Sequence, residues 1–468
     1  MKEETMATPP FEHLVVLMLE NRSFDHMLGF LKSPSYQIEG LDPNNLATND
    51  PSVGNVPIPV TNDARTVNDL NPDPAHDFLN VNVQIFGNKS GTTAGPLMRG
   101  FVRDYAAVSN DPARGPNVMK CFTQQTLPVL STLAKEFAVC DHWFSSVPGP
   151  TIPNRLFAHA AHSAGSATQD AILAPLKLKT IFEIIDDPNN PFSFRIYAGT
   201  VGGTILLANL YMIHHQDGFH PYEEFRSDCA HGDLPAYTFI EPRYDDDIAN
   251  GVFANSQHPD FPVDEGEALI ADVYSAIRNS PLWPSTLLLI VYDEHGGIFD
   301  HVPPPALSPD LKFPPVPASA NPAFQFDRLG VRVPAVFVSP RIKSGTILPQ
   351  RFDHCSIVAT VRTLFCLDKK PFNWREAQAA TFDNILNLSP ANIRTDNVVL
   401  PAPFVSAGAP PQPQVRTPSD LTMYVAQSIQ AAADALGVKL NMHVNDIYSA
   451  QDAVEFLRQA AGQLDSKG

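Results

Sequence analysis

The chain has 468 residues, of which 44% are hydrophobic, so it is long enough to bury a sizeable core. Its 32 Lys and Arg against 50 Asp and Glu give a formal net charge of −18. This acidic balance disfavours nucleic acid as a partner, because there is no basic surplus to neutralise phosphates. It also disfavours simple electrostatic adsorption to anionic membranes.

The first informative segment is residues 13–29, HLVVLMLENRSFDHMLG. Its apolar run, 14–19, predicts a strand that is buried on both faces. Such a strand would deliver the carboxylate of Glu20 and the amide of Asn21 to whatever lies at its end. The alternative is that these polar residues only terminate the strand.

The residues before this strand, MKEETMATPP, are polar and acidic, and the apolar run is too short for a secretory core or a membrane span. We therefore expect no transmembrane segment. The five cysteines are scattered without CxxC spacing, which favours reduced thiols over a disulfide framework. Both features favour a cytoplasmic location; secretion followed by removal of a leader is left open.

Residues 141–163, DHWFSSVPGPTIPNRLFAHAAHS, predict a rigid loop that presents Thr151. Prolines and a glycine at 148–150 fix the loop, and Pro153 suits the first turn of a helix that runs from Asn154. A helix N-terminus favours an anion, although Thr151 could also be an ordinary N-cap. Beside a metal, its hydroxyl could act as a nucleophile near neutral pH.

Three further apolar runs, 236–240, 286–292 and 333–338, also end in polar or turn residues. Between them, 264–279 has apolar residues at helical spacing. Buried strands that alternate with helices indicate an α/β fold around a mainly parallel sheet. In such sheets, functional sites form at the carboxyl ends of the strands.

The run 286–292 ends in Asp293 and Glu294, followed by His295 and two glycines. Adjacent acids form a costly like-charge cluster unless a cation neutralises it. Together with Glu20 and Asn21 they would form an oxygen-rich pocket for a hard divalent cation. Acids can also simply end a strand at the surface, but two such ends in one chain favour a metal.

Histidines in loop-like contexts could supply proton transfer and phosphate contacts, because imidazole can donate to phosphoryl oxygens or protonate a leaving group. The chain has 15 histidines, so chance placement competes with a functional reading of any single one. The candidates are His76, His214, His215, His220, His258 and His354.

Residues 401–418, PAPFVSAGAPPQPQVRTP, form a proline-rich linker after a domain that we place at residues 1–400. Two helices are expected to follow it. The first begins at Thr417, with Pro418 at the first helical position, and ends near Gly437. The second begins at Ser449 in a capping-box-like pair with Asp452. We interpret residues 419–468 as a helical appendage packed on the main domain.

Taken together, ENRSFDH (20–26), SSVPGPTIPNRLF (145–157), YDEHGGIFDHVPPP (292–305) and FDHCS (352–356) resemble the phosphoesterase family. This family contains bacterial phospholipases C, plant non-specific phospholipases C and a group of acid phosphatases. Ordered matches run from about residue 11 to 367. The resemblance implies a three-layer α/β/α alkaline-phosphatase-like fold with a mainly parallel central sheet.

The resemblance also implies a divalent metal ion held by Glu20, Asn21, Thr151, Asp293 and Glu294. Thr151 would be the nucleophile as well as a ligand, and would form a phosphothreonine intermediate. Oxygen ligands suit calcium, magnesium or manganese, and nearby histidines would admit zinc or iron, so the identity of the metal stays open.

His76 and His258 correspond to histidines that the family places around the phosphoryl group. A further active-site histidine is expected between them: His220 is favoured, with His215 of the His214–His215 pair as the alternative. The phosphate-binding set implied is therefore Asn21, His76, His220 and His258. Bacterial phospholipases carry Asn at the position of His295, so we expect His295 not to be essential.

The resemblance favours a phospholipase C that acts on phospholipids, a hydrolase of phosphoric ester bonds. An acid phosphatase that acts on phosphomonoesters is the alternative with the same site. An alternative of another class is a non-catalytic, metal-stabilised binding protein, but no nucleophile or acid is replaced here. A sulfatase or phosphomutase is disfavoured, because neither usually carries this ENRSFDH and DEHGG pair.

Overall fold

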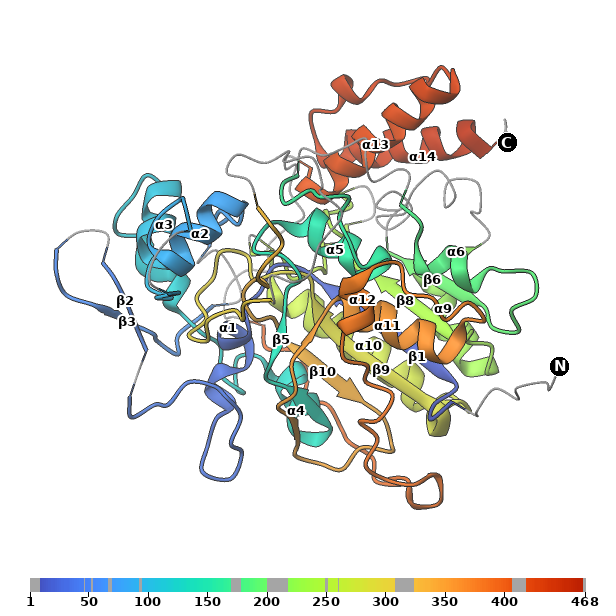
Figure 1. The fold of residues 1–468 in the computed structure, drawn as a ribbon, viewed down its shortest axis with the longest axis horizontal. Coiled ribbons are helices and arrows are strands. Elements are labelled where there is room, and N and C mark those ends of the chain that lie inside the picture. Colours follow the sequence, from blue (N-terminus) through green and yellow to red (C-terminus); the bar gives the residue numbers. More distant parts are fainter. Residues whose placement is uncertain are drawn as a thin grey trace.

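A central sheet of eight strands organises the chain in a computed structural model (Figure 1). The strand order is β11-β4-β10-β9-β1-β8-β6-β7. The structure describes residues 9–45, 47–51, 54–65, 70–91, 95–169, 178–199, 218–248, 251–259, 261–307, 324–405 and 418–465. The strands of the sheet are β1 (His13–Leu19), β4 (Ala138–Cys140), β6 (Phe194–Ala198), β7 (Phe219–Pro221), β8 (Tyr237–Glu241), β9 (Thr286–Tyr292), β10 (Ala335–Val338) and β11 (Thr346–Leu348).

The four predicted apolar runs are β1, β8, β9 and β10, and all are buried. β1 lies parallel to β8 and β9, and β6 is parallel to β7 and β8, whereas β10 runs antiparallel to β9 and β4. A mainly parallel sheet is therefore confirmed. Two short pairs lie outside it: β2 (Thr48–Asn49) with β3 (Ile58–Pro59), and β5 (Trp143–Phe144) with β12 (Phe352–Asp353).

Helices cover both faces of the sheet, which confirms the three-layer α/β/α class (Figure 1). On one face α5 (Thr151–Ala160) and α6 (Ile181–Ile185) contact α11 (Cys355–Phe365), which also contacts α12 (Trp374–Gln378). On the other face α10 (Val263–Arg278) contacts α4 (Pro128–Glu136) and α9 (Tyr222–His231). α10 is the helix expected at 264–279. α1 (Phe24–Leu28) follows β1 directly.

Two pairs of helices extend the core. α2 (Phe78–Phe86) and α3 (Phe101–Val108) pack on each other beside the edge of the sheet where β1 ends (Figure 1). At the C-terminus, α13 (Asp420–Leu436) packs against α14 (Ala450–Asp465). In the part of the chain that the structure describes, 3₁₀ turns also lie at Gly29–Leu31, Gly115–Met119, Trp283–Ser285, Pro390–Asn392 and Val444–Asp446.

The C-terminal pair lies directly above α5 (Figure 1). One apolar cluster joins Ile152, Leu156 and Ala160 of α5 to Leu421, Tyr424 and Val425 of α13 and to Ala453 and Phe456 of α14. The expected start of α13 was wrong by two residues: its N-cap is Ser419, whose hydroxyl accepts a hydrogen bond from the backbone of Thr422. Thr417 lies outside the described residues.

The start of α5 also differs from the expectation. The helix begins at Thr151 rather than at Asn154, and Pro150 is its N-cap residue. Pro153 therefore occupies the third helical position, where its missing N–H costs nothing because the first four amides have no intrahelical partner. Thr151 is the first residue of the helix, and its side chain is free to bond elsewhere.

Within the described residues, no helix combines the length and apolar character needed to cross a membrane. All five cysteines are buried as free thiols. Burial raises the pKa of each thiol, so none of them is poised as a nucleophile at neutral pH.

Candidate active site

The ends of β1 and β9 bring four of the predicted residues together. The parallel register pairs Leu19 with Tyr292, so Glu20 and Asn21 follow one strand where Asp293 and Glu294 follow its neighbour. The backbone amide of Asn21 donates to Oδ1 of Asp293 at 3.2 Å. All four side chains are buried, with at most 1% exposed.

Two glycines allow the loops around these acids to approach each other. Gly296 has a φ of +64°, and a Cβ on it would lie 2.2 Å from the backbone oxygen of Asn21. Gly297 has a φ of +66°, and a Cβ there would lie 2.6 Å from the backbone oxygen of Ala75. Only glycine satisfies both the backbone conformation and the close contact, which explains the GG pair after the acids.

Thr151 points its hydroxyl at the end of β1. Its Oγ1 donates to Oδ1 of Asn21 at 3.3 Å, and the residue is buried. The loop before it is held by Asn154, whose Oδ1 accepts from the backbone of Val147 and whose Nδ2 donates to the carbonyl of Pro150 at 3.0 Å. One asparagine side chain therefore fixes the loop that presents Thr151.

Arg155 lies at the centre of the acids, and the sequence reasoning missed it. Its Nε is 3.0 Å from Oδ2 of Asp293, its Nη1 is 3.3 Å from Oε2 of Glu241, and its Nη2 is 3.7 Å from Oε1 of Glu20. Two features of the sequence point to Arg155 and Glu241. Arg155 follows Thr151 by four positions on one helix, and Glu241 ends β8, the strand beside β1.

The acids carry more negative charge than these contacts balance. Burial raises the pKa of Glu20 to about 8 and that of Glu241 to about 7, although Arg155 opposes both shifts. Within the described residues, Oε2 of Glu20 and Oε1 of Glu294 are buried with no hydrogen-bond partner. Such orphaned carboxylate oxygens are costly.

A divalent cation fits this arrangement. The four buried carboxylates are Glu20, Glu241, Asp293 and Glu294, and the buried basic groups that contact them are Arg155, His76 and His295. In the described part of the chain, the atoms of these acids without a hydrogen-bond partner include Oε2 of Glu20 and Oε1 of Glu294, and carboxylate oxygens are the ligands that hard divalent cations prefer.

His76 lies beside Glu294, and His258 lies next to His76. Nε2 of His76 is 4.0 Å from Oε1 of Glu294, and the two imidazole rings are 6.4 Å apart between centroids. Burial opposes the charge on His76, but Glu294 and Asp73 outweigh it and raise its pKa to about 9. Oδ2 of Asp73 lies 3.7 Å from a ring nitrogen of each histidine, which makes Asp73 a second residue that the sequence reasoning missed.

The structure does not bring His220 to this cluster. It lies on β7, the third strand from β1, which corresponds to a lateral distance of about 14 Å. Its Nδ1 is 2.9 Å from Oε2 of Glu224, and its ring lies beside Tyr197. His214 and His215 lie outside the described residues.

His354, one of the candidate histidines, and Arg22 hold the two strand ends. Nε2 of His354 lies 2.6 Å from the backbone oxygen of Asp293. Arg22 donates to the backbone oxygens of Gln257 at 2.7 Å and His258 at 3.2 Å, so it ties the His258 loop to the turn after β1.

A second group of possible metal ligands, Asp25, Asp300 and His301, lies on the far side of this turn. Arg332 already neutralises it: its Nε donates to Asp300 at 2.9 Å and its Nη2 to Asp25 at 3.1 Å. Nδ1 of His301 lies 2.6 Å from the other oxygen of Asp25. We interpret this group as an ion-pair network, which leaves the strand-end acids as the better metal site.

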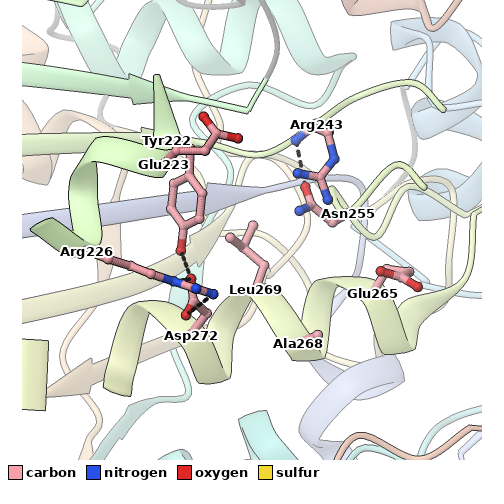
Figure 2. Close-up of a pocket in the computed structure, with 9 residues that line it drawn as sticks. All are labelled: Tyr222, Glu223, Arg226, Arg243, Asn255, Glu265, Ala268, Leu269 and Asp272. Carbon is pink, nitrogen blue, oxygen red and sulfur yellow. Dashed lines mark hydrogen bonds and ion pairs between the residues drawn. The ribbon is translucent and has the colours of Figure 1, made fainter. Parts of the chain in front are cut away.

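A cavity of about 340 Å³ opens between α9 and α10. Figure 2 shows the residues that line it. None of the predicted site residues lines it. Asp272 closes one end, where it accepts from Tyr222 at 2.6 Å and pairs with Arg226 at 2.6 Å. Arg243 and Asn255 line another part (Figure 2). The cavity is therefore distinct from the strand-end acids.

Comparisons with known proteins agree on one family. The sequence model of the phosphoesterase family matches residues 11–368. Non-specific phospholipase C3 of Arabidopsis thaliana is 37% identical over 466 residues, which cover 94% of this chain and 84% of that protein. Non-specific phospholipase C6 of the same plant is 40% identical and covers 81% and 72%. Phospholipase C B of Mycobacterium tuberculosis is 27% identical and covers 81% and 78%.

Solved structures with similar folds are more distant. The lipoteichoic acid synthase LtaP from Listeria monocytogenes has 10% identity and a TM-score of 0.37, covering 81% of this chain and 78% of its own. A protein of the alkaline phosphatase superfamily from Vibrio parahaemolyticus has 13% identity and a TM-score of 0.31, covering 55% and 64%. Both TM-scores are below 0.5, so these structures add no argument beyond the sequence relatives.

Proposed function

The chain belongs to the phosphoesterase family, a group of hydrolases that act on phosphoric esters, and from this premise we propose that it is a phospholipase C. The observation that carries the proposal is the position of the Thr151 hydroxyl. It lies at the N-terminus of α5, 3.3 Å from Oδ1 of Asn21, beside buried carboxylates that have oxygens without a hydrogen-bond partner. A nucleophile next to a cation site and two histidines is suited to phosphoryl transfer.

The residues that would hold a divalent ion are Glu20, Asn21, Thr151, Asp293 and Glu294. When bound, such an ion would lower the pKa of the Thr151 hydroxyl and offset negative charge on the phosphoryl oxygens. Support for this assignment comes from the orphaned oxygens of Glu20 and Glu294 and from the raised pKa of Glu20.

Thr151 attacks phosphorus and gives up its hydroxyl proton to solvent, while the bond from phosphorus to the glycerol oxygen breaks. The leaving diacylglycerol takes a proton from protonated His76 or from His258. Water then attacks the phosphothreonine: its hydroxyl goes to phosphorus and its proton returns to Thr151, which releases the head-group phosphate, and the histidine regains from solvent the proton that it gave to diacylglycerol. Asn21 orients the Thr151 hydroxyl for the first attack, before the phosphothreonine forms.

The choice of a phospholipid substrate is supported by the relatives, several of which are named non-specific phospholipase C. An acid phosphatase would use the same residues on a phosphomonoester. Parallel assays on phosphatidylcholine vesicles and on an aryl phosphomonoester separate the two. We expect the diester to be hydrolysed with the higher kcat/KM; a preference for the monoester would overturn the phospholipase assignment.

The covalent intermediate can be tested directly. Enzyme quenched during turnover of phosphatidylcholine should yield a peptide with phosphocholine on Thr151, detected by mass spectrometry. The same peptide should be unmodified in Thr151→Ala. An adduct on another residue, or a rapid burst with an unmodified Thr151, would contradict the proposed nucleophile.

A further inference from the structure

A chain of buried hydrogen bonds runs from the acid turn to α2 and α3. Nε2 of His295 lies 2.8 Å from Oε1 of Gln84, a residue of α2. Nε2 of Gln84 donates to Oδ2 of Asp104 on α3 and to the backbone oxygen of Ala75, each at 2.8 Å. All of these side chains are buried, and the chain starts next to Glu294 and ends next to His76.

The surroundings fix which way the Gln84 amide points. Its nitrogen faces two acceptors, a carbonyl and a carboxylate, so the amide oxygen cannot take that place without losing both bonds. The oxygen must therefore face His295, and Nε2 of His295 must carry the proton that it accepts. Gln84 thus fixes a proton on Nε2 of this imidazole and leaves the state of Nδ1 to its contact with Glu294.

The other edge of His295 meets the candidate site. Its Nδ1 lies 3.3 Å from Oε2 of Glu294, which also accepts from the backbone of Gly296 at 2.8 Å. With Oε2 engaged in this way, the free oxygen of Glu294 is Oε1, the atom 4.0 Å from His76. The same glutamine holds the carbonyl that immediately precedes His76.

We propose that Gln84 is a positioning residue for the phosphoester reaction, which holds Glu294 through His295 and holds His76 through the Ala75 carbonyl. It touches neither substrate nor reacting atoms, and acts from helix α2 on both sides of the site. The expected effect on turnover rests on the proposed function, whereas the hydrogen bonds of Gln84 do not depend on it. Residues that orient catalytic or metal-binding groups typically affect activity by about 10- to 100-fold.

The kinetic test replaces Gln84 by a side chain of similar length without polar atoms. Gln84→Met should lower kcat by about 10- to 100-fold and change KM less than about threefold on whichever phosphoric ester the unmodified protein hydrolyses. Asn80→Ala is the matched control, because Asn80 on the same helix donates to the other oxygen of Asp104 at 2.8 Å. The control should keep kcat within about twofold.

A double mutant separates positioning from general loosening of the fold. If Gln84 acts partly through His295, Gln84→Met should cost kcat less in a His295→Asn background than in the unmodified protein. Equal fold-losses in both backgrounds, or an Asn80→Ala variant as slow as Gln84→Met, would overturn the proposal.

A spectroscopic readout needs neither substrate nor a stable Gln84 variant. In protein with ¹⁵N-labelled histidine, the His295 signals are identified by their loss in His295→Asn. We expect Nε2 of His295 to be protonated in the unmodified protein and in Asn80→Ala, and to lose this fixed state in Gln84→Met. An unprotonated Nε2 in the unmodified protein would by itself refute the proposed hydrogen bond, whatever the substrate proves to be.

Discussion

The hydroxyl of Thr151 donates to the side-chain oxygen of Asn21 across 3.3 Å, although 130 positions separate the two residues in the chain. One comes from the first turn of α5 and the other from the turn after β1. This single contact joins the two motifs that the sequence analysis considered separately, and it places the candidate nucleophile against the strand-end acids.

Replacing Thr151 tests its role. Thr151→Ala should lower kcat by about 10⁴-fold or more, because the attacking oxygen is removed. Thr151→Ser, which keeps the hydroxyl, should retain measurable turnover. Circular dichroism and the unfolding midpoint should stay close to those of the unmodified protein in both variants. Substantial activity in the alanine variant would eliminate Thr151 as the nucleophile.

Replacing Asp293 tests the metal site. Asp293→Asn removes one charged ligand, so we expect loss of bound divalent metal, measured by elemental analysis, together with loss of activity. Asp300→Asn is the matched control, because it alters the network around Arg332 rather than the strand-end acids. If metal content falls only in the control, the metal belongs to the second group of ligands.

Removing Arg155 should be costly for stability. Arg155→Met leaves three carboxylates without their buried partner, and we expect the free energy of unfolding to fall by about 3–5 kcal/mol. Adding Glu241→Gln should recover part of that loss, since one uncompensated charge disappears. Chemical denaturation of the single and double variants measures both effects. A double variant no more stable than Arg155→Met would show that charge is not the cause.

His258 lies at the candidate site and His220 does not, so replacing them should have different effects on kcat/KM. His258→Ala should lower kcat/KM by about 10²–10⁴-fold, as expected for a group that transfers a proton or contacts the phosphoryl group. His220→Ala should stay within about twofold, because His220 lies on β7 and pairs with Glu224. A large loss in His220→Ala would restore it as the third active-site histidine.

The ion pair between His301 and Asp25 should contribute to stability in a pH-dependent way. Burial opposes the charge on His301, but Asp25 outweighs it and raises the pKa of His301 from 6.5 to about 9. The stabilisation is therefore fully present below about pH 6.5 and is lost as the pH rises through about 9. His301→Asn should lower the free energy of unfolding by about 1–2 kcal/mol near pH 6, after allowance for solvent screening, and by less near pH 9.5. If His301→Asn lowered the free energy of unfolding equally near pH 6 and near pH 9.5, the ion pair between His301 and Asp25 would not be the source of the stabilisation.

The sequence predicted those features that depend on local patterns. Apolar runs of five to seven residues bounded by turn residues favour buried strands, and polar residues that follow neighbouring parallel strands meet at one edge of the sheet. Glu20 and Asp293 do lie at the same edge, at the ends of the paired strands β1 and β9. The same rule applied to β8 would also have found Glu241, whose strand had been identified.

Other features depend on contacts between distant segments, which no local pattern encodes. Arg155 is an ordinary helical residue until the fold surrounds it with three acids. Asp73 stands out only because two loops place His76 and His258 on either side of it. The start of α5 was misplaced because Pro153 suits any position in the first turn, and only Asn154 reveals which position it takes.

The cluster formed by α5, α13 and α14 has a practical consequence for trimming the chain. A protein that stops at residue 400, where the proline-rich segment suggests a natural end, would expose the apolar face of the helix that begins with Thr151. Ile152 and Leu156 would lose the cover that now leaves each at most 2% exposed. Forms shortened to residue 400 should therefore aggregate, although they keep every residue of the candidate site. The smallest unit fit for expression includes α14.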